Sequence, residues 1–284
     1  MGETGKDLAD LVRRALREDA ADGDMTTRIL VDEKTRGRAI ILARAAGVVS
    51  GQRCARAVFT SLEPSISYEE AKTDGSKITA GETAATVAGP LRAILSGERT
   101  ALNFLQHLSG IATSVSRFVE RVEGTKAVIL DTRKTTPGLR SLEKEAVRNG
   151  GGSNHRRDLA GLILVKENHI AAAGGIEGVI DLLGDRMEKA EIEVGSLEEL
   201  AKLRGSRPWR IMLDNFAPEM VEEAMRELEE WEARPEIEVS GGMTMENVRL
   251  YADLGVDYIS IGSVTASAPA LDMSLIVEEV NRVD

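Results

Sequence analysis

The spacing of apolar residues divides the chain into segments of different character. Residues 5–18 have apolar positions at helical spacing and predict an amphipathic helix. Residues 38–49 and 65–70 predict strands on either side of a short helix over residues 54–62. Turns at Asp74-Gly75 and Ala80-Gly81 complete a small α+β unit, for which we expect an antiparallel sheet.

A long apolar stripe follows from about Ser96 and predicts one helix that links two domains. Its positions are Leu102, Leu105, Leu108, Ile111, Val115, Phe118 and Val122.

The next part of the chain alternates short apolar runs with segments of helix-forming composition. The runs are 127–130, 162–165, 191–194, 210–213, 237–239 and 258–261. Repeated strand and helix units with right-handed crossovers form a parallel sheet, and this many in succession favour a β/α barrel. An open doubly wound sheet is the alternative. Leu271, Leu275, Ile276 and Val280 then return to helical spacing and predict a C-terminal helix over residues 267–284.

Composition narrows the class of protein. The chain of 284 residues has a formal net charge of −11, which disfavours a general nucleic-acid binder because such proteins need positive surface. Its polar start does not resemble a signal peptide, and no apolar run is long enough for a membrane span. Cys54 is the single cysteine, which excludes an internal disulfide and is compatible with a cytoplasmic location.

One segment of this acidic chain is positively charged. Residues 131–157 carry seven Lys or Arg against three acids, a net +4, and also contain three consecutive glycines, Asn154 and His155. A basic island in an acidic chain predicts a pocket for a polyanion.

Each of the six apolar runs ends in polar or glycine residues. The groups are Asp131 to Lys134, Lys166 to His169, Glu193, Asp214-Asn215, Ser240 to Gly242, and Gly262-Ser263. The carboxyl ends of barrel strands converge on one mouth, so we expect these residues to meet there. Glycine loops can bind a phosphate through their backbone N–H groups, and the carboxylates of Glu193 and Asp214 can bind ribose hydroxyls or a divalent cation. The Lys and Arg side chains can bind the carboxylates of a substrate.

The same residues carry a resemblance that spans nearly the whole chain. DTRKTTPGLR, GGGSNHRRDLAGLILVKENHI, IMLDNF, EVSGGMTMENV and GVDYISIGSVTASAPALDMSL resemble the quinolinate phosphoribosyltransferases, as do ALREDAADGDMTTRIL and SGERTALNFLQHLSGIAT. The resemblance implies an incomplete β/α barrel over residues 111–266. It also implies an α+β N-terminal domain over residues 1–110, joined by the C-terminal helix.

The family's reaction joins quinolinate to phosphoribosyl pyrophosphate and releases pyrophosphate and carbon dioxide, giving nicotinate mononucleotide for NAD biosynthesis. The resemblance implies that Arg133, His155 and Arg156 bind the two carboxylates of quinolinate, with Lys134 and Lys166 between it and the phosphoribosyl donor. Thr132 belongs to the same substrate-binding set. Ser240, Gly241, Gly262 and Ser263 match the 5′-phosphate loops. Glu193 and Asp214 match the acids that hold the ribose and Mg²⁺, directly or through water.

The resemblance further implies a homodimer in which Arg99 reaches the partner's site, with assembly into a higher oligomer left open. Ala266 stands where many relatives have a histidine, so the role of that histidine has no counterpart here.

Three rival functions stay open at this stage. Lys166 at a strand end is compatible with a Schiff-base lyase, and the barrel is compatible with a non-catalytic nucleotide-binding module. A related phosphoribosyltransferase acting on nicotinate or another acid is the third.

Overall fold

The computed structural model describes residues 5–282, which divide into two compact units. Unit 1 comprises residues up to 116, residues 136–151 and residues from 267 onward. Unit 2 comprises residues 117–135 and 152–266.

Unit 1 is built on a four-stranded antiparallel sheet with the order β12-β1-β5-β3. Its strands are β1 (Arg36–Ala43), β3 (Ser67–Glu70), β5 (Thr83–Pro90) and β12 (Met273–Asn281), and β2 (Gly47–Val48) pairs separately with β4 (Lys77–Ile78). Its helices are α1 (Gly5–Glu18), η1 (Ala21–Gly23), α2 (Met25–Leu30), α3 (Gln52–Leu62) and α5 (Arg140–Asn149). The expected antiparallel sheet is therefore confirmed.

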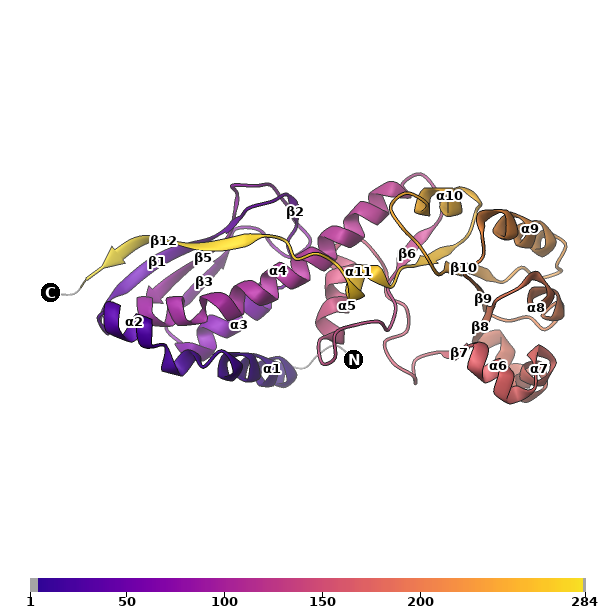
Figure 1. Ribbon diagram of the computed structural model, residues 1–284, viewed down its shortest axis with the longest axis horizontal. Helices are drawn as coiled ribbons and strands as arrows, with labels where there is room; N and C mark the ends of the chain where they lie inside the picture. The colour runs from indigo at the N-terminus through magenta and orange to yellow at the C-terminus, as the bar shows by residue number, and fades with distance from the viewer. Residues whose placement is uncertain (1–4, 283–284) are drawn as a thin grey trace. The chain divides into compact units, whose positions relative to one another are not determined.

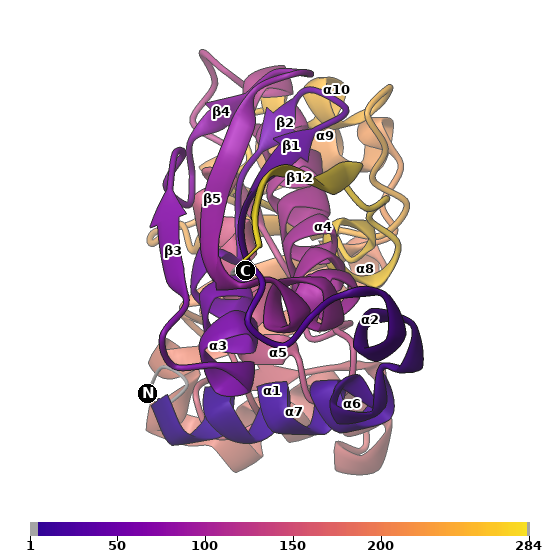
Figure 2. The ribbon, with the colours of Figure 1, turned by 90° about the vertical axis from the view of Figure 1, so that its left-hand side faces the viewer.

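The expected C-terminal helix is wrong, because residues 273–281 form strand β12 antiparallel to β1. Figure 2 shows β12 alongside β1 in this sheet. Apolar positions such as Leu275, Ile276 and Val280 fit helical spacing, but the β-branched Ile276, Val277 and Val280 favour a strand. One edge of the eight-residue strand β1 is available to pair with this segment, which the spacing of apolar residues does not reveal.

Helix α4 (Leu91–Arg121) is the long helix that the apolar stripe predicts, and its residues contribute to both units. It begins five residues before Ser96, immediately after β5 ends at Pro90.

Unit 2 contains a six-stranded parallel sheet in the order β6-β11-β10-β9-β8-β7, as the six apolar runs predict. The strands are β6 (Val128–Leu130), β7 (Ile163–Val165), β8 (Ala190–Val194), β9 (Arg210–Asp214), β10 (Glu236–Ser240) and β11 (Tyr258–Ser260). The connecting helices are α6 (Glu167–Ala173), α7 (Ile176–Leu183), η2 (Gly184–Lys189), α8 (Leu197–Lys202), α9 (Pro218–Glu229), α10 (Val248–Asp253) and α11 (Ser263–Ala266). Figure 1 shows them following the strands in turn.

Ser153 adds a single parallel bridge to Leu130 at the β6 edge of this sheet. The segment 150–155, which we call the glycine loop, thus extends the sheet by one residue beyond β6. The other edge of the sheet is β7, so the strands form an incomplete barrel. The fold class expected from the sequence is confirmed.

Candidate functional site

A cavity of about 560 Å³ lies at the carboxyl ends of the unit 2 strands and forms the mouth of the barrel. It is lined by Thr132, Arg133, Lys134, His155, Arg156, Leu164, Lys166, Glu193, Met212, Asp214, Asn215, Ser240, Gly241, Gly242 and Ser260. Most of the residues predicted from strand ends therefore meet at one place, as the barrel rule requires.

One wall of the mouth is cationic and suits an anion. The Nε of Arg156 is buried and has no hydrogen-bond partner among the described residues, while its Nη1 donates to the carbonyl of Leu162 at 3.1 Å. Burial lowers the pKa of Arg156, and the neighbouring charge of Arg133 lowers it further. Because a buried guanidinium donor needs an acceptor, a carboxylate bound here would satisfy it.

Asp131 fixes the loop that carries these cations. Its carboxylate is buried and accepts hydrogen bonds from Asn154 Nδ2 at 2.7 Å and from the backbone N–H of His155 at 2.8 Å. Asp131 thus joins the end of β6 to the glycine loop and acts as a structural anchor.

His155 lines the mouth with its ring nitrogens engaged by the protein. Nδ1 accepts the backbone N–H of Arg156 at 2.7 Å, and Nε2 lies 3.0 Å from Glu191 and 3.7 Å from Glu238. An acceptor at Nδ1 places the proton of the neutral ring on Nε2, which faces these two carboxyl groups.

The opposite wall is anionic. The Lys166 Nζ pairs with the carboxylate of Glu193, and Asp214 accepts a hydrogen bond from Asn215 Nδ2 at 2.6 Å. Lys166 is half-buried, so its ammonium stays within reach of a ligand in the mouth.

Glu193 and Asp214 fit the magnesium ion that the resemblance implies. Mg²⁺ takes oxygen ligands, retains several waters and is usually held by one or two protein carboxylates together with phosphate oxygens. Two half-buried carboxylates in a cavity that also has cations for phosphates and carboxylates match that demand.

The turn after β10 requires glycine. Gly241 has a φ of +96°, and a Cβ there would lie 2.1 Å from Asn215 Oδ1. After β11, a Cβ on Gly262 would lie 2.9 Å from Cδ of Lys134, so the absence of a side chain leaves room for the lysine stem.

The strand-end residues Asp131, Glu167, Asn168 and His169 do not line the mouth. Nor do three of the positions that the resemblance assigns to the site. Arg99 is exposed on α4 in unit 1, whereas Gly262 and Ser263 follow β11 just outside the lining. Thr265 donates to the carbonyl of Lys134 at 2.8 Å, and Ala266, where many relatives have histidine, is exposed.

A second layer of polar side chains lies below the mouth, inside the barrel, and we call it the closed layer. It consists of Glu191, Arg210 and Glu238, all buried, and of Ser260, which also lines the mouth. Arg210 donates to Glu238 at 2.8 Å and to Glu236 at 2.8 Å, with its guanidinium between the Trp209 and Tyr258 rings. Glu191, Glu238 and His155 place ligand atoms within 4.8 Å of one another, but Arg210 already supplies the cation for this group.

Sequence reasoning missed the closed layer, although a signal for it exists. Successive strand residues point to opposite faces, so Glu191 shares a face with Glu193, and Glu238 with Ser240. The alternating polar positions in EIEV and EIEVS therefore mark an inward face two layers deep.

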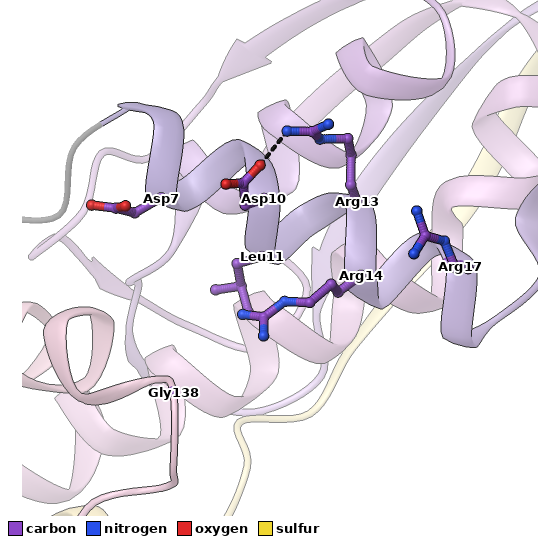
Figure 3. Close-up of a pocket in the computed structure, with 7 residues that line it drawn as sticks. All are labelled: Asp7, Asp10, Leu11, Arg13, Arg14, Arg17 and Gly138. Atoms are coloured by element: carbon purple, nitrogen blue, oxygen red, sulfur yellow. Dashed lines mark hydrogen bonds and ion pairs between the residues drawn. The ribbon is translucent and has the colours of Figure 1, made fainter.

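Unit 1 has another cavity of about 560 Å³, along α1 (Figure 3). It is lined by Asp7, Asp10, Leu11, Arg13, Arg14, Arg17 and Gly138, and Arg13 pairs with Asp10. Its arginines come from a single helix, whereas the mouth draws cations, carboxylates and glycines from several strand ends. The mouth is therefore the candidate active site.

Family models match both parts of the chain. The model "Quinolinate phosphoribosyl transferase, C-terminal domain" covers residues 111–276, and the corresponding N-terminal domain model covers residues 24–109. The chain belongs to the quinolinate phosphoribosyltransferase family. The resemblance seen in the sequence motifs is thereby confirmed.

Relatives of this family match over most of their length. The chain is 39% identical to nicotinate-nucleotide pyrophosphorylase [carboxylating] of Mycobacterium leprae, over 94% of this chain and 95% of that protein. It is 37% identical to the human protein of the same name, over 94% and 91%. The solved structure of NadC from Streptococcus pyogenes has a TM-score of 0.90 at 36% identity and covers 99% of each chain.

Proposed function

We propose that the mouth joins quinolinate to the phosphoribosyl group of phosphoribosyl pyrophosphate, with decarboxylation, to form nicotinate mononucleotide for NAD biosynthesis. The observation that carries this proposal is the pairing of a cationic wall, with its buried and unpaired Arg156 Nε, against the carboxylates of Glu193 and Asp214. Membership of the family and the names of the relatives supply the identity of the substrates.

The cationic wall would hold the two carboxylates of quinolinate. Arg133 and Arg156 are assigned to these carboxylates because a guanidinium can donate two parallel hydrogen bonds to each. Thr132, Lys134 and Lys166 complete the wall toward the phosphoribosyl donor. His155 is assigned to the same pocket, where it orients Arg156 through the hydrogen bond at its Nδ1.

The anionic wall would stabilise the sugar. As pyrophosphate leaves, positive charge develops at the anomeric carbon, and the carboxylates of Glu193 and Asp214 oppose it while they hold the ribose hydroxyls. Magnesium, bound through these acids directly or through water, would neutralise charge on the leaving pyrophosphate. Ser240, Gly241, Gly262 and Ser263 are assigned to the 5′-phosphate.

The pyridine nitrogen then attacks the anomeric carbon and becomes a cation. The adjacent carboxylate leaves as carbon dioxide, its bonding electrons remain on the ring carbon, and that carbon takes a proton. No enzyme nucleophile is required. This agrees with a mouth in which Lys166 is ion-paired with Glu193, since a Schiff-base lysine is usually desolvated and neutral.

Product analysis tests the assignment against its nearest rival. Enzyme, phosphoribosyl pyrophosphate and Mg²⁺ are incubated with quinolinate or with nicotinate, and carbon dioxide and nicotinate mononucleotide are measured. We expect both products from quinolinate. Product from nicotinate and none from quinolinate would overturn the assignment, and a borohydride-trapped adduct on Lys166 would favour the lyase.

Arg99 is assigned to the site of a second copy, which makes the working enzyme a homodimer. Its exposure on α4 leaves it accessible to a partner. Mixing inactive Arg99→Ala and Lys134→Ala subunits should restore activity, because one of the two sites in a mixed dimer then has both residues. No recovery after verified subunit exchange would contradict a shared site.

A cytoplasmic location is proposed from the lone thiol. Cys54 is the single cysteine of the chain and is buried, an arrangement that a reducing compartment permits. Across residues 5–282 no helix combines the length and apolar character that a membrane crossing needs.

A further inference from the structure

Glu238 lies in the closed layer with charged or polar partners on every neighbouring element. Its carboxyl group is buried and contacts Arg210 of β9 at 2.8 Å and the hydroxyl of Ser260 of β11. From the glycine loop, His155 Nε2 approaches it to 3.7 Å, and Glu191 of β8 belongs to the same cluster. Glu236 on its own strand shares Arg210.

Glu191 and Glu238 are two buried carboxyl groups whose oxygen atoms lie within 4.8 Å of one another. Arg210 forms ion pairs with both Glu238 and Glu236, so its charge is divided between these two acids. His155 Nε2 faces the same pair, at 3.0 Å from Glu191 and 3.7 Å from Glu238. Because two buried carboxylates this close repel each other, the Glu191 and Glu238 pair favours retaining one proton.

Burial favours the protonated form of both acids, and it raises the pKa of Glu191 as well. Burial raises the pKa of Glu238 to about 7, and the neighbouring Glu191 contributes in the same direction. The carboxyl group is therefore near its midpoint at neutral pH, although no solvent-exposed surface reaches it.

We propose that Glu238 is a positioning residue for the dicarboxylate substrate, acting through His155 and Arg156. When Glu238 holds a proton, the closed layer carries one negative charge less and the mouth binds a dianion. When the proton is lost, a negative charge remains beneath the cationic wall and opposes the substrate's carboxylates. Because the coupling is reciprocal, binding of the dianion raises the affinity of Glu238 for its proton. This inference rests on the proposed function only for the identity of the dianion.

The Michaelis constant for quinolinate tests the inference directly. At saturating phosphoribosyl pyrophosphate and Mg²⁺, the wild-type KM should rise about tenfold between pH 6 and 8.5, an ordinary size for such coupling. Quinolinate itself remains a dianion over this range because carboxyl groups ionise near pH 4. In Glu238→Gln the rise should shrink to about twofold or less, since an amide neither gains nor loses the proton.

Glu236→Gln is the matched control. It removes one carboxylate from the same strand and the same arginine, but Glu236 is 38% exposed and lies one layer lower. Its KM profile should keep the wild-type rise. If the rise of KM with pH were reduced equally in both variants, the ion pairs of Arg210, and not the proton on Glu238, would determine the pH dependence of KM.

Calorimetry provides a readout that a merely structural role would not change. Phthalate, a ring dicarboxylate that cannot react, is titrated at pH 7.5 in two buffers of different ionisation enthalpy. Wild-type protein should take up a substantial fraction of one proton per phthalate bound, whereas Glu238→Gln should take up essentially none. Equal proton uptake by both proteins would overturn the proposal.

Ser260→Ala keeps the test decisive if Glu238→Gln does not fold. Ser260 donates to the Glu238 carboxylate and thereby favours its ionised form, so its removal should move the KM rise to higher pH. An unmoved or lowered midpoint would contradict the proposal. Wild-type turnover of quinolinate with a KM independent of pH would refute only this inference, whereas no turnover at any pH would refute the proposed function.

Discussion

The mouth and the closed layer use the same residue types for different purposes. In the mouth, Lys166 pairs with Glu193 at the half-buried end of β8. In the closed layer, Arg210 pairs with Glu238 where both side chains are almost fully buried. The two layers stand one pleat apart, since Glu191 and Glu193, like Glu238 and Ser240, are alternate residues of one strand.

Access to solvent and ligand explains the difference. A half-buried ion pair can exchange partners with a ligand at modest cost, so the mouth can bind and release charged substrates. A buried pair cannot lose one partner without leaving an unpaired charge in the interior, so the closed layer must retain its charges or its proton. The predictions below test this contrast.

The largest expected effect is loss of stability in Arg210→Met. The change leaves Glu236 and Glu238 without their shared cation and removes the contact with the Trp209 and Tyr258 rings. We expect a loss of about 4 kcal/mol in the free energy of unfolding at pH 8, measured by urea denaturation. Arg204→Met is the control, because its ion pair with Glu230 is exposed and should change stability by about 0.5 kcal/mol or less.

Glu193→Gln should affect the reaction and spare the fold. Removing the charge opposite the developing cation should lower kcat about 10²–10³-fold, with little change in the quinolinate KM. Steady-state kinetics and a melting curve measure the two effects. Glu198→Gln, on the exposed helix α8, should behave as wild type. A loss of stability as large as that of Arg210→Met would erase the distinction between the layers.

Glu238→Gln should alter how stability depends on pH. The pKa of Glu238 is raised from the ordinary 4.5 to about 7, so its favourable contribution is present at low pH and is lost as pH rises through 7. Relative to the variant, the wild type should therefore lose on the order of 3 kcal/mol of unfolding free energy between pH 4.5 and 8. Parallel stability curves for the two proteins would show that Glu238 does not titrate in this range.

Arg156→Ala is expected to have the smallest effect of the four in free energy. Loss of a charge-assisted donor to a substrate carboxylate should raise the quinolinate KM about 10–100-fold, with a smaller change in kcat. Arg157→Ala removes the neighbouring exposed cation and serves as the control in the same assay. Equal effects of the two changes would indicate general attraction by the basic segment and no specific contact.

Local patterns predict the elements more reliably than their partners. The six apolar runs all became strands of one parallel sheet, because buried parallel strands require continuous apolar stretches. The segment 273–281 was misassigned because its spacing suits either a helix or an edge strand, and only pairing with β1 selects the strand. Ser153, which extends the sheet by one bridge, carries no periodic signal at all.

The candidate site shows the same division between local and tertiary information. The strand-end motifs place Arg133, Lys166, Glu193 and Asp214 at the mouth, because the barrel fold brings all carboxyl ends together. The orientation of His155 was not predictable, since it depends on Glu191 and Glu238, which are distant in the sequence. Its Nε2 points at carboxyl groups below the mouth, a fact that the motif GGGSNHR does not contain.

The sequence by itself determined the family, the six strands of the parallel sheet and the chemistry available at each strand end, because these depend on residue type and local spacing. Only the tertiary structure decided which acids face solvent and which share a closed interior with Arg210. Burial sets the pKa of a carboxyl group through its environment. The environment of these carboxyl groups forms only in the folded chain, where strands that are distant in the sequence lie side by side.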